Sequence, residues 1–223
     1  MEVNVAQKRV GVLLSGCGVF DGAEIHEAVL TLLYLDQQGA QVVCMAPDVA
    51  QAHVINHLTQ EEMKESRNVL VEAARIARGE IKNLKDVKAK DLDALILPGG
   101  FGAAKNLSEF AFKGPGGMVH PEVQRIIAEF KAAGKPIGAM CIAPATVGMA
   151  LKNQGVTITI GSEESVIGAL RAIGVNHTIC TVDQIAVDAT HKIVTSPAYM
   201  LGPGIKDIAK GIERLVEKVL ALA

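Results

Sequence analysis

The fold is decided by residues 136–144, which read PIGAMCIAP. Pro136–Met140 has the apolar character of a buried strand, and Cys141 follows it directly. The next residues open a predicted helix over Ala143–Asn153, because Pro144 suits the first turn of a helix. A strand that turns directly into a helix at a cysteine is typical of a nucleophile elbow, which lifts the side chain above the sheet.

Working outward, short apolar runs alternate with helical periodicity along the whole chain, as in a doubly wound parallel sheet. The predicted strands are Val10–Leu14, Gln41–Ala46, Ala94–Leu97, Pro136–Met140, Thr157–Ile160 and Lys192–Thr195, with extended pieces at His177–Val182 and Ile185–Val187. The predicted helices lie near Glu24–Gln38, Ser66–Arg78, Pro121–Ala133, Ala143–Asn153, Glu163–Ile173 and Ile205–Leu222. The fold class is therefore α/β with a mainly parallel sheet.

The composition fits one domain over residues 1–223, because single cores stop growing only above about 250 residues. Apolar residues make up 49% of the chain and aromatic residues 3%, so aliphatic side chains must fill a core of the kind that parallel sheets bury on both faces. The segment Pro47–Lys90 contains no clean strand. We predict that it is an insertion that caps the crevice, with Arg67 and Asn68 as its contacts to the pocket.

Charge and termini exclude several classes of partner. The formal net charge is -2, with 22 basic and 24 acidic residues interspersed, so the chain has no electrostatic footprint for nucleic acid or an anionic membrane. Met1–Arg9 is polar and lacks the apolar core of a secretory signal. We expect a cytoplasmic protein with small-molecule or protein partners, although a processed organellar form would leave no trace in the sequence.

The four cysteines are far apart and form no C-x-x-C pair, which predicts reduced thiols and no metal site. In an open parallel sheet, ligands bind at the carboxyl ends of the strands. Gly99 and Gly100 follow a predicted strand and allow the backbone to aim N–H groups there, although such pairs are usually only turns. The helix dipole is expected to lower the pKa of Cys141; a buried, inert cysteine is the alternative.

Glu24 and Glu27 fall in the first turn of the first predicted helix, where carboxylates most often only interact with the helix dipole. Because this helix starts beside the same sheet edge, one of them is a candidate proton donor and acceptor. The histidines are poorly placed: His191 precedes a strand and should lie at the amino edge, and His26 should point to a different helical face from Glu27.

Five motifs resemble, in order and along essentially the whole chain, those of the ElbB isoprenoid-biosynthesis proteins of the ThiJ/PfpI superfamily. They are Leu14–Gly18 with Asp21–Ala28, Ser66–Leu70, Gly99–Leu107, Cys141–Pro144 and Thr195–Met200. The resemblance implies a flavodoxin-like three-layer sandwich of the class I glutamine amidotransferase-like type, with a nucleophilic Cys141. Counting back from Gly39, the superfamily glutamate falls on Glu27, with Glu24 one turn earlier.

The resemblance also implies glyoxalase activity, which converts glyoxal or methylglyoxal to glycolate or lactate without glutathione, metal or organic cofactor. Main-chain N–H groups of Gly100 and Ile142 would hold the oxyanion. Thr159–Ser162 occupies the region where many superfamily hydrolases carry a histidine, so peptidase or glutaminase chemistry is not expected. The alternative function is a thiol-based redox sensor or stress-response binding protein with only weak catalysis.

Four further residues are candidates for the site, and each has a simpler role. Cys17 is a candidate to resolve an oxidised Cys141, and the simpler alternative is a spectator thiol. Asn106 is a candidate to bind the second oxygen of a dicarbonyl substrate, and the simpler alternative is a helix cap. Pro197 and Tyr199 line the pocket, or Tyr199 only packs. A homodimer is expected, because superfamily members commonly associate and the chain is rich in apolar residues.

Overall fold

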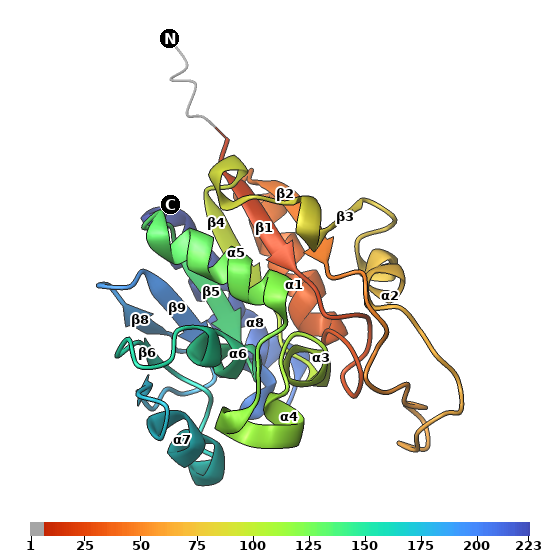
Figure 1. Cartoon of the computed structure of the whole chain (residues 1–223). Coiled ribbons are helices and arrows are strands. Elements are labelled where there is room, and N and C mark those ends of the chain that lie inside the picture. Colours follow the sequence, from red (N-terminus) through yellow and green to blue (C-terminus); the bar gives the residue numbers. More distant parts are fainter. Residues whose placement is uncertain (1–6) are drawn as a thin grey trace.

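The computed structural model describes residues 7–223 and shows a central sheet between two layers of helices (Figure 1). In spatial order, the seven strands are β3 (Ile81–Asn83), β2 (Gln41–Ala46), β1 (Arg9–Leu13), β4 (Ala94–Leu97), β5 (Ile137–Met140), β9 (Ile193–Ser196) and β8 (Ala186–Asp188). Only the β8–β9 pair is antiparallel among these neighbours. The predicted α/β fold with a mainly parallel sheet is confirmed.

Helices cover both faces of the sheet and enclose a separate apolar core on each. One face carries α1 (Ile25–Gln37), α2 (Val69–Ile76) and α8 (Ile205–Leu222). The other carries α3 (Phe101–Lys105), α4 (Phe110–Lys113), α5 (Pro121–Ala132), α6 (Ala143–Ala150) and α7 (Glu164–Arg171). Successive residues of β4 alternate between the cores, with Ile96 in the first and Leu95 and Leu97 in the second. This two-sided burial explains why the strands read as unbroken apolar runs.

Short elements complete the chain. The strands β6 (Thr157–Ile158) and β7 (Asn176–His177) form a small parallel sheet of their own. The 3-10 helices are η1 (Leu84–Asp86), η2 (Ala89–Asp91), η3 (Gly114–Gly116) and η4 (Ala198–Met200). Residues 1–6, most of the polar segment Met1–Arg9, lie outside the described residues. Within residues 7–223, none of the helices combines the length and apolar character that crossing a bilayer requires.

The segment Pro47–Lys90 differs from its prediction, because it contains β3, which extends the sheet beside β2. β3 is an edge strand of three residues, none of which is fully buried. Such a short, partly exposed strand leaves no apolar run in the sequence. The helix α2 packs on the same face as α1 and α8. Much of the predicted insertion is therefore part of the βα framework. The predicted extended piece His177–Val182 is wrong beyond His177, where the chain has no regular structure.

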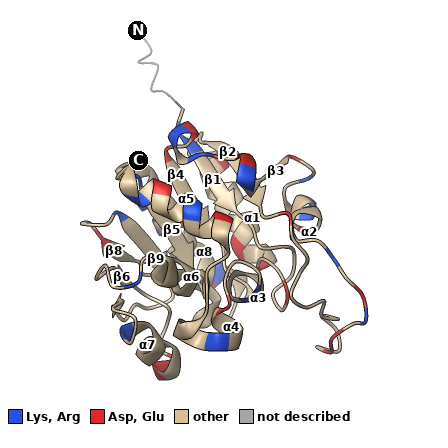
Figure 2. Cartoon of the chain, viewed as in Figure 1, with Lys and Arg blue, Asp and Glu red and all other residues tan. Residues whose placement is uncertain are grey.

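The arrangement of charge is even. Figure 2 shows that acidic and basic residues are interspersed along helices, strands and loops. The parallel direction of β1, β4, β5 and β9 brings their carboxyl ends to one edge of the sheet. That edge holds Cys141, immediately after β5.

Candidate active site

The backbone at Cys141 is held in a left-handed turn. Its φ is 58°, a value that non-glycine residues rarely adopt because the side chain crowds the carbonyl. The Cys141 N–H donates to the Ser196 carbonyl at 3.0 Å, which fixes the turn to the end of β9. The Gly100 and Ile142 N–H groups act on the sulfur and favour its ionised form, since both lower the pKa of Cys141. The predicted nucleophile elbow is confirmed, with α6 beginning at Ala143.

Two glycines after β4 lie against the cysteine and the start of α1. A Cβ at Gly99 would lie 2.4 Å from the Cys141 Cβ and 2.6 Å from Glu27 Oε2. Gly100 has a φ of 91°, and a Cβ there would lie 2.3 Å from the Glu24 nitrogen. Both positions therefore exclude any side chain, Gly99 through close packing and Gly100 through packing and conformation.

Glu27 is completely buried at the start of α1. Its carboxyl group accepts hydrogen bonds from the Gly99 N–H at 2.8 Å and the Tyr199 N–H at 3.2 Å. It lies beside the Cys141 thiol, because a Cβ at Gly99 would be 2.6 Å from Glu27 Oε2 and 3.0 Å from Cys141 Sγ. Burial and the nearby Glu24 charge raise the pKa of Glu27 to about 8, against the opposing effect of the two N–H groups. At neutral pH the carboxyl group is therefore mostly protonated, and it can donate to the sulfur.

Glu24 has a different task from Glu27. It is the N-cap of α1, where its Oε2 accepts from the Glu27 N–H at 2.7 Å. Its own N–H donates to the Gly99 carbonyl at 2.9 Å. Glu24 therefore holds the beginning of the helix against the Gly99–Gly100 turn, and its charge acts on Glu27 from one turn away.

The predicted lowering of the Cys141 pKa is wrong. Burial, followed by the charge of Glu27, raises the pKa of Cys141 well above its usual value, although the Gly100 and Ile142 N–H groups act in the opposite direction. The prediction counted the helix dipole but omitted the cost of burying a thiolate. Only 8% of the surface of Cys141 is exposed. Cys141 and Glu27 therefore titrate as one coupled pair.

The chain after β9 closes the site from a third side. Pro197 is buried and is the N-cap of η4, and Ala198, the first residue of η4, is buried with a φ of 43°. This strained turn aims the Tyr199 N–H at Glu27. The Tyr199 hydroxyl lies 2.7 Å from Nδ1 of His26. Sequence reasoning missed His26, because this contact joins residues 173 positions apart and no local pattern reports it.

Asn106 and Cys17 lie near the same edge but are occupied elsewhere. The Asn106 amide nitrogen donates to the Ser15 and Asp21 carbonyls, and its oxygen accepts from the Ala52 N–H at 2.9 Å. Asn106 thus ties the loops after β1 and β2 to the end of α3, and the predicted cap of the next helix is wrong, because Glu109 is the N-cap of α4. Cys17 is half-buried; burial and the charge of Glu72 on α2 raise its pKa. The charged neighbours of Cys17 include Glu72 and Arg75 of α2, whereas the carboxyl group beside Cys141 is Glu27 of α1.

The remaining sequence candidates serve local structure. Asn68 caps α2 by accepting from the Val71 N–H at 3.0 Å, and Arg67 pairs with Glu65 and Glu72. His191 binds Asp188 at 2.7 Å before β9, at the amino edge, as predicted. No cluster of three potential metal-ligating side chains occurs among residues 7–223.

Comparison with known proteins identifies the family. The model of the DJ-1/PfpI family matches residues 17–200. The ES1 protein homolog, mitochondrial, of Rattus norvegicus is 48% identical and covers 96% of this chain and 84% of that protein. The glutamine amidotransferase-like class 1 domain-containing protein 3, mitochondrial, of Homo sapiens is also 48% identical, with coverage of 96% and 83%. The chain therefore belongs to the DJ-1/PfpI family.

A solved structure gives the same result for the fold. The isoprenoid biosynthesis protein with amidotransferase-like domain from Ehrlichia chaffeensis has a TM-score of 0.91 and 36% identity, and the match covers 96% of this chain and 99% of that chain. The resemblance drawn from the sequence motifs and the amidotransferase-like fold are confirmed. The predicted cytoplasmic location is contradicted, because the rat and human relatives are both described as mitochondrial.

Proposed function

We propose that this DJ-1/PfpI family protein is a glutathione-independent glyoxalase that acts on glyoxal or methylglyoxal. The proposal is supported above all by the position of the buried Glu27 carboxyl group beside the Cys141 thiol, both of which a Cβ at Gly99 would touch, at 2.6 Å from Glu27 Oε2 and 3.0 Å from Cys141 Sγ. A nucleophile and a proton carrier in direct contact are what the conversion of a 2-oxoaldehyde to a 2-hydroxy acid needs. All proton transfers are assigned to this chain's own side chains and water, without metal or organic cofactor.

In the first step, the Cys141 sulfur forms a bond to the aldehyde carbon. The thiol proton passes through Glu27 to the aldehyde oxygen, and the product is a hemithioacetal. The developing oxyanion is stabilised by the Gly100 and Ile142 N–H groups, which already lower the pKa of the sulfur. Because both N–H groups belong to rigid turns, they need little reorganisation when the charge develops.

In the second step, ionised Glu27 removes the proton from the carbon bonded to sulfur and returns it to the neighbouring carbon through an enediolate. The result is a thioester of Cys141, which water hydrolyses to the 2-hydroxy acid and the free thiol. With a pKa of about 8, roughly a tenth of the Glu27 groups are ionised at pH 7. The same group therefore accepts and donates protons close to neutral pH, as a general acid and base must.

Amide hydrolysis has less support from this site. It requires an acid to protonate a poor leaving group, for which cysteine enzymes use a paired histidine. Among residues 7–223, no histidine is hydrogen-bonded to Cys141: His177 accepts from the Ile160 N–H at 3.3 Å, and His26 contacts Tyr199. An aldehyde is a stronger electrophile and loses no leaving group in the addition step.

The test is a glyoxalase assay with methylglyoxal in the absence of metal and glutathione. Wild type should form lactate, and Cys141→Ser should reduce turnover to background, because the alcohol has no paired base strong enough to ionise it. Cys17→Ser is the matched control and should keep its activity. Full activity in Cys141→Ser would rule out the mechanism.

Absence of turnover in wild type, with oxidation of Cys141 by peroxide, would instead favour the redox-sensor alternative. The homodimer stays a prediction, and light scattering at micromolar concentration tests it.

A further inference from the structure

His26 and Tyr199 form a polar pair beside Glu27 that the mechanism above does not use. The Tyr199 hydroxyl and His26 Nδ1 are 2.7 Å apart, and the ring centroids are 5.9 Å apart. His26 is exposed, whereas Tyr199 is partly buried and packs against the apolar core that contains Cys141. His26 is therefore the solvent-exposed member of the pair, and Tyr199 is the member that reaches the core beside the reactive groups.

The main chain ties this pair to the reactive groups. The Tyr199 N–H donates to Glu27 Oε1, and the same carboxyl group lies beside the Cys141 thiol at Gly99. Burial and then the charges of Glu24 and Glu27 raise the pKa of Tyr199. The phenol hydroxyl thus lies within electrostatic reach of both carboxyl groups and keeps its proton, so it is available as a hydrogen-bond donor.

A dicarbonyl substrate brings a second oxygen that the oxyanion N–H groups do not bind. The sequence offered Asn106 for this oxygen, but the Asn106 amide already makes three hydrogen bonds to the main chain. Among residues 7–223, the Tyr199 hydroxyl has one hydrogen-bond partner, His26, and that partner can donate as well as accept. When His26 Nδ1–H donates to the phenol oxygen, the phenol proton is free to donate to a carbonyl.

We propose that Tyr199 binds the second carbonyl oxygen of a 2-oxoaldehyde at this site, and that His26 is the positioning residue that orients its hydroxyl. The proposal rests on the proposed glyoxalase function and names the feature that separates dicarbonyls from simple aldehydes. A simple aldehyde such as propanal has no second oxygen and gains nothing from Tyr199. The pair therefore sets substrate specificity, whereas Cys141 and Glu27 carry out the chemistry.

The experiment measures how well an aldehyde protects Cys141 from alkylation by iodoacetamide in brief incubations, which does not require turnover. Tyr199→Phe should weaken protection by methylglyoxal about tenfold, the usual effect of one lost hydrogen bond, and leave protection by propanal unchanged. The alkylation rate without aldehyde should stay the same, because the main-chain N–H to Glu27 remains. In steady state, KM for methylglyoxal should rise more than kcat falls.

His26 is tested by two substitutions at the same position. His26→Ala should weaken protection by methylglyoxal severalfold, and His26→Asn should restore it, because the Asn amide can donate to the phenol oxygen from a similar place. His53→Ala is the matched control and should behave as wild type, since His53 packs against Phe112. Equal behaviour of His26→Ala and His26→Asn would overturn the positioning role.

The outcomes separate this proposal from the glyoxalase function. Protection that depends on Tyr199 without any lactate formation would refute the function and support the binding role. Lactate formation with unchanged protection in Tyr199→Phe would overturn the binding role and leave the function intact. Equal weakening for methylglyoxal and propanal would also overturn it, because a general distortion of the site does not distinguish the two aldehydes.

Discussion

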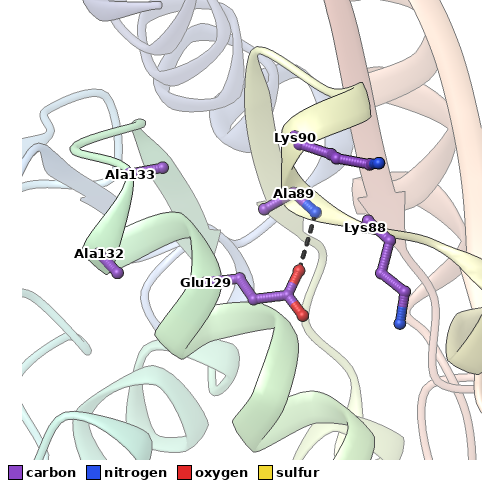
Figure 3. Close-up of a pocket in the computed structure, with 6 residues that line it drawn as sticks. All are labelled: Lys88, Ala89, Lys90, Glu129, Ala132 and Ala133. Carbon is purple, nitrogen blue, oxygen red and sulfur yellow. Dashed lines mark hydrogen bonds between the residues drawn. The ribbon is translucent and has the colours of Figure 1, made fainter.

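A glutamate on a helix lies near each edge of the sheet, Glu129 at the amino ends of the strands and Glu27 at their carboxyl ends. Their pKa values shift in opposite directions. At the amino end, Glu129 of α5 lines an open hollow of about 610 Å³ with Lys88, Ala89, Lys90, Ala132 and Ala133 (Figure 3). Its carboxylate accepts from the Ala89 N–H at 3.0 Å and from Arg125 at 2.7 Å. Partial burial acts against these contacts, but they outweigh it and lower the pKa of Glu129.

At the carboxyl end, the Gly99 and Tyr199 N–H groups also lower the pKa of Glu27, but they do not offset its burial. Its main charged neighbour is Glu24, a like charge, and the side chain is fully buried, so its pKa rises to about 8. The glutamate of the open hollow is thus one half of an ordinary ion pair with Arg125, whereas the buried site contains a carboxyl group that can exchange protons near neutral pH. The environment of an acid identifies a reactive site better than the size of a cavity does.

Gly99→Ala should have the largest effect on this comparison, because the new Cβ would overlap both the Cys141 Cβ and Glu27 Oε2. Separation of the two groups should reduce turnover about a hundredfold or more, the cost of misplacing reacting groups by about 1 Å. The control is Gly168→Ala in α7, where a Cβ meets nothing within 4 Å and helix propensity gains up to about 1 kcal/mol. Comparable turnover in both variants would contradict the close approach at Gly99.

Glu27→Gln should lower turnover about a hundredfold or more, because an amide cannot carry the proton. It should also remove a pH dependence of stability. The folded protein keeps the Glu27 proton up to about pH 8, whereas the unfolded chain releases it near the usual value of 4.5. The free energy of unfolding of wild type should therefore fall as pH rises between these values, by up to about 5 kcal/mol.

Urea unfolding of both proteins between about pH 5 and pH 9 measures this difference. The absolute stability of Glu27→Gln is not diagnostic. The Gly99 and Tyr199 N–H groups donate to the two carboxyl oxygens, so the amide nitrogen that replaces one of them loses a hydrogen bond whatever the ionisation of Glu27. The diagnostic quantity is the slope with pH, which should be shallower in the variant. Parallel pH profiles for the two proteins would mean that Glu27 is already ionised in the folded state.

Glu24→Gln should be much milder, with turnover reduced less than about tenfold, because the Gln oxygen can still cap α1. The loss of the Glu24 charge removes one cause of the raised Glu27 pKa, so the pKa of Glu27 should fall. The pH profile of kcat/KM should accordingly move to lower pH. If this variant is as damaging as Glu27→Gln, the assignment of the catalytic carboxyl group to Glu27 is unsafe.

Glu129→Gln should have the smallest effect on turnover, which should remain at the wild-type level. The loss of its charged contact with Arg125 should cost about 1 kcal/mol of stability, measured by thermal unfolding. A large loss of turnover with normal stability would move the chemistry to the amino end of the sheet and reverse the comparison.

The sequence predicted much of the site because its signals are local. The elbow at Cys141 follows from an apolar run, a cysteine and a helix-starting Pro144 within nine residues. Helical spacing alone places Glu27 one turn after Glu24, the N-cap of α1. The parallel sheet then brings the ends of β4 and β5 together, so Gly100 lies against Cys141 as the topology requires.

The sequence by itself therefore determined the layers, the elbow and which carboxyl groups start the first helix. Only the tertiary structure decided the ionisation of Cys141 and Glu27, because desolvation depends on burial by residues from every part of the chain. The edge strand β3 and the contact between His26 and Tyr199 were also decided there. Both depend on partners supplied by distant segments, whereas periodicity and capping report only what a segment does alone.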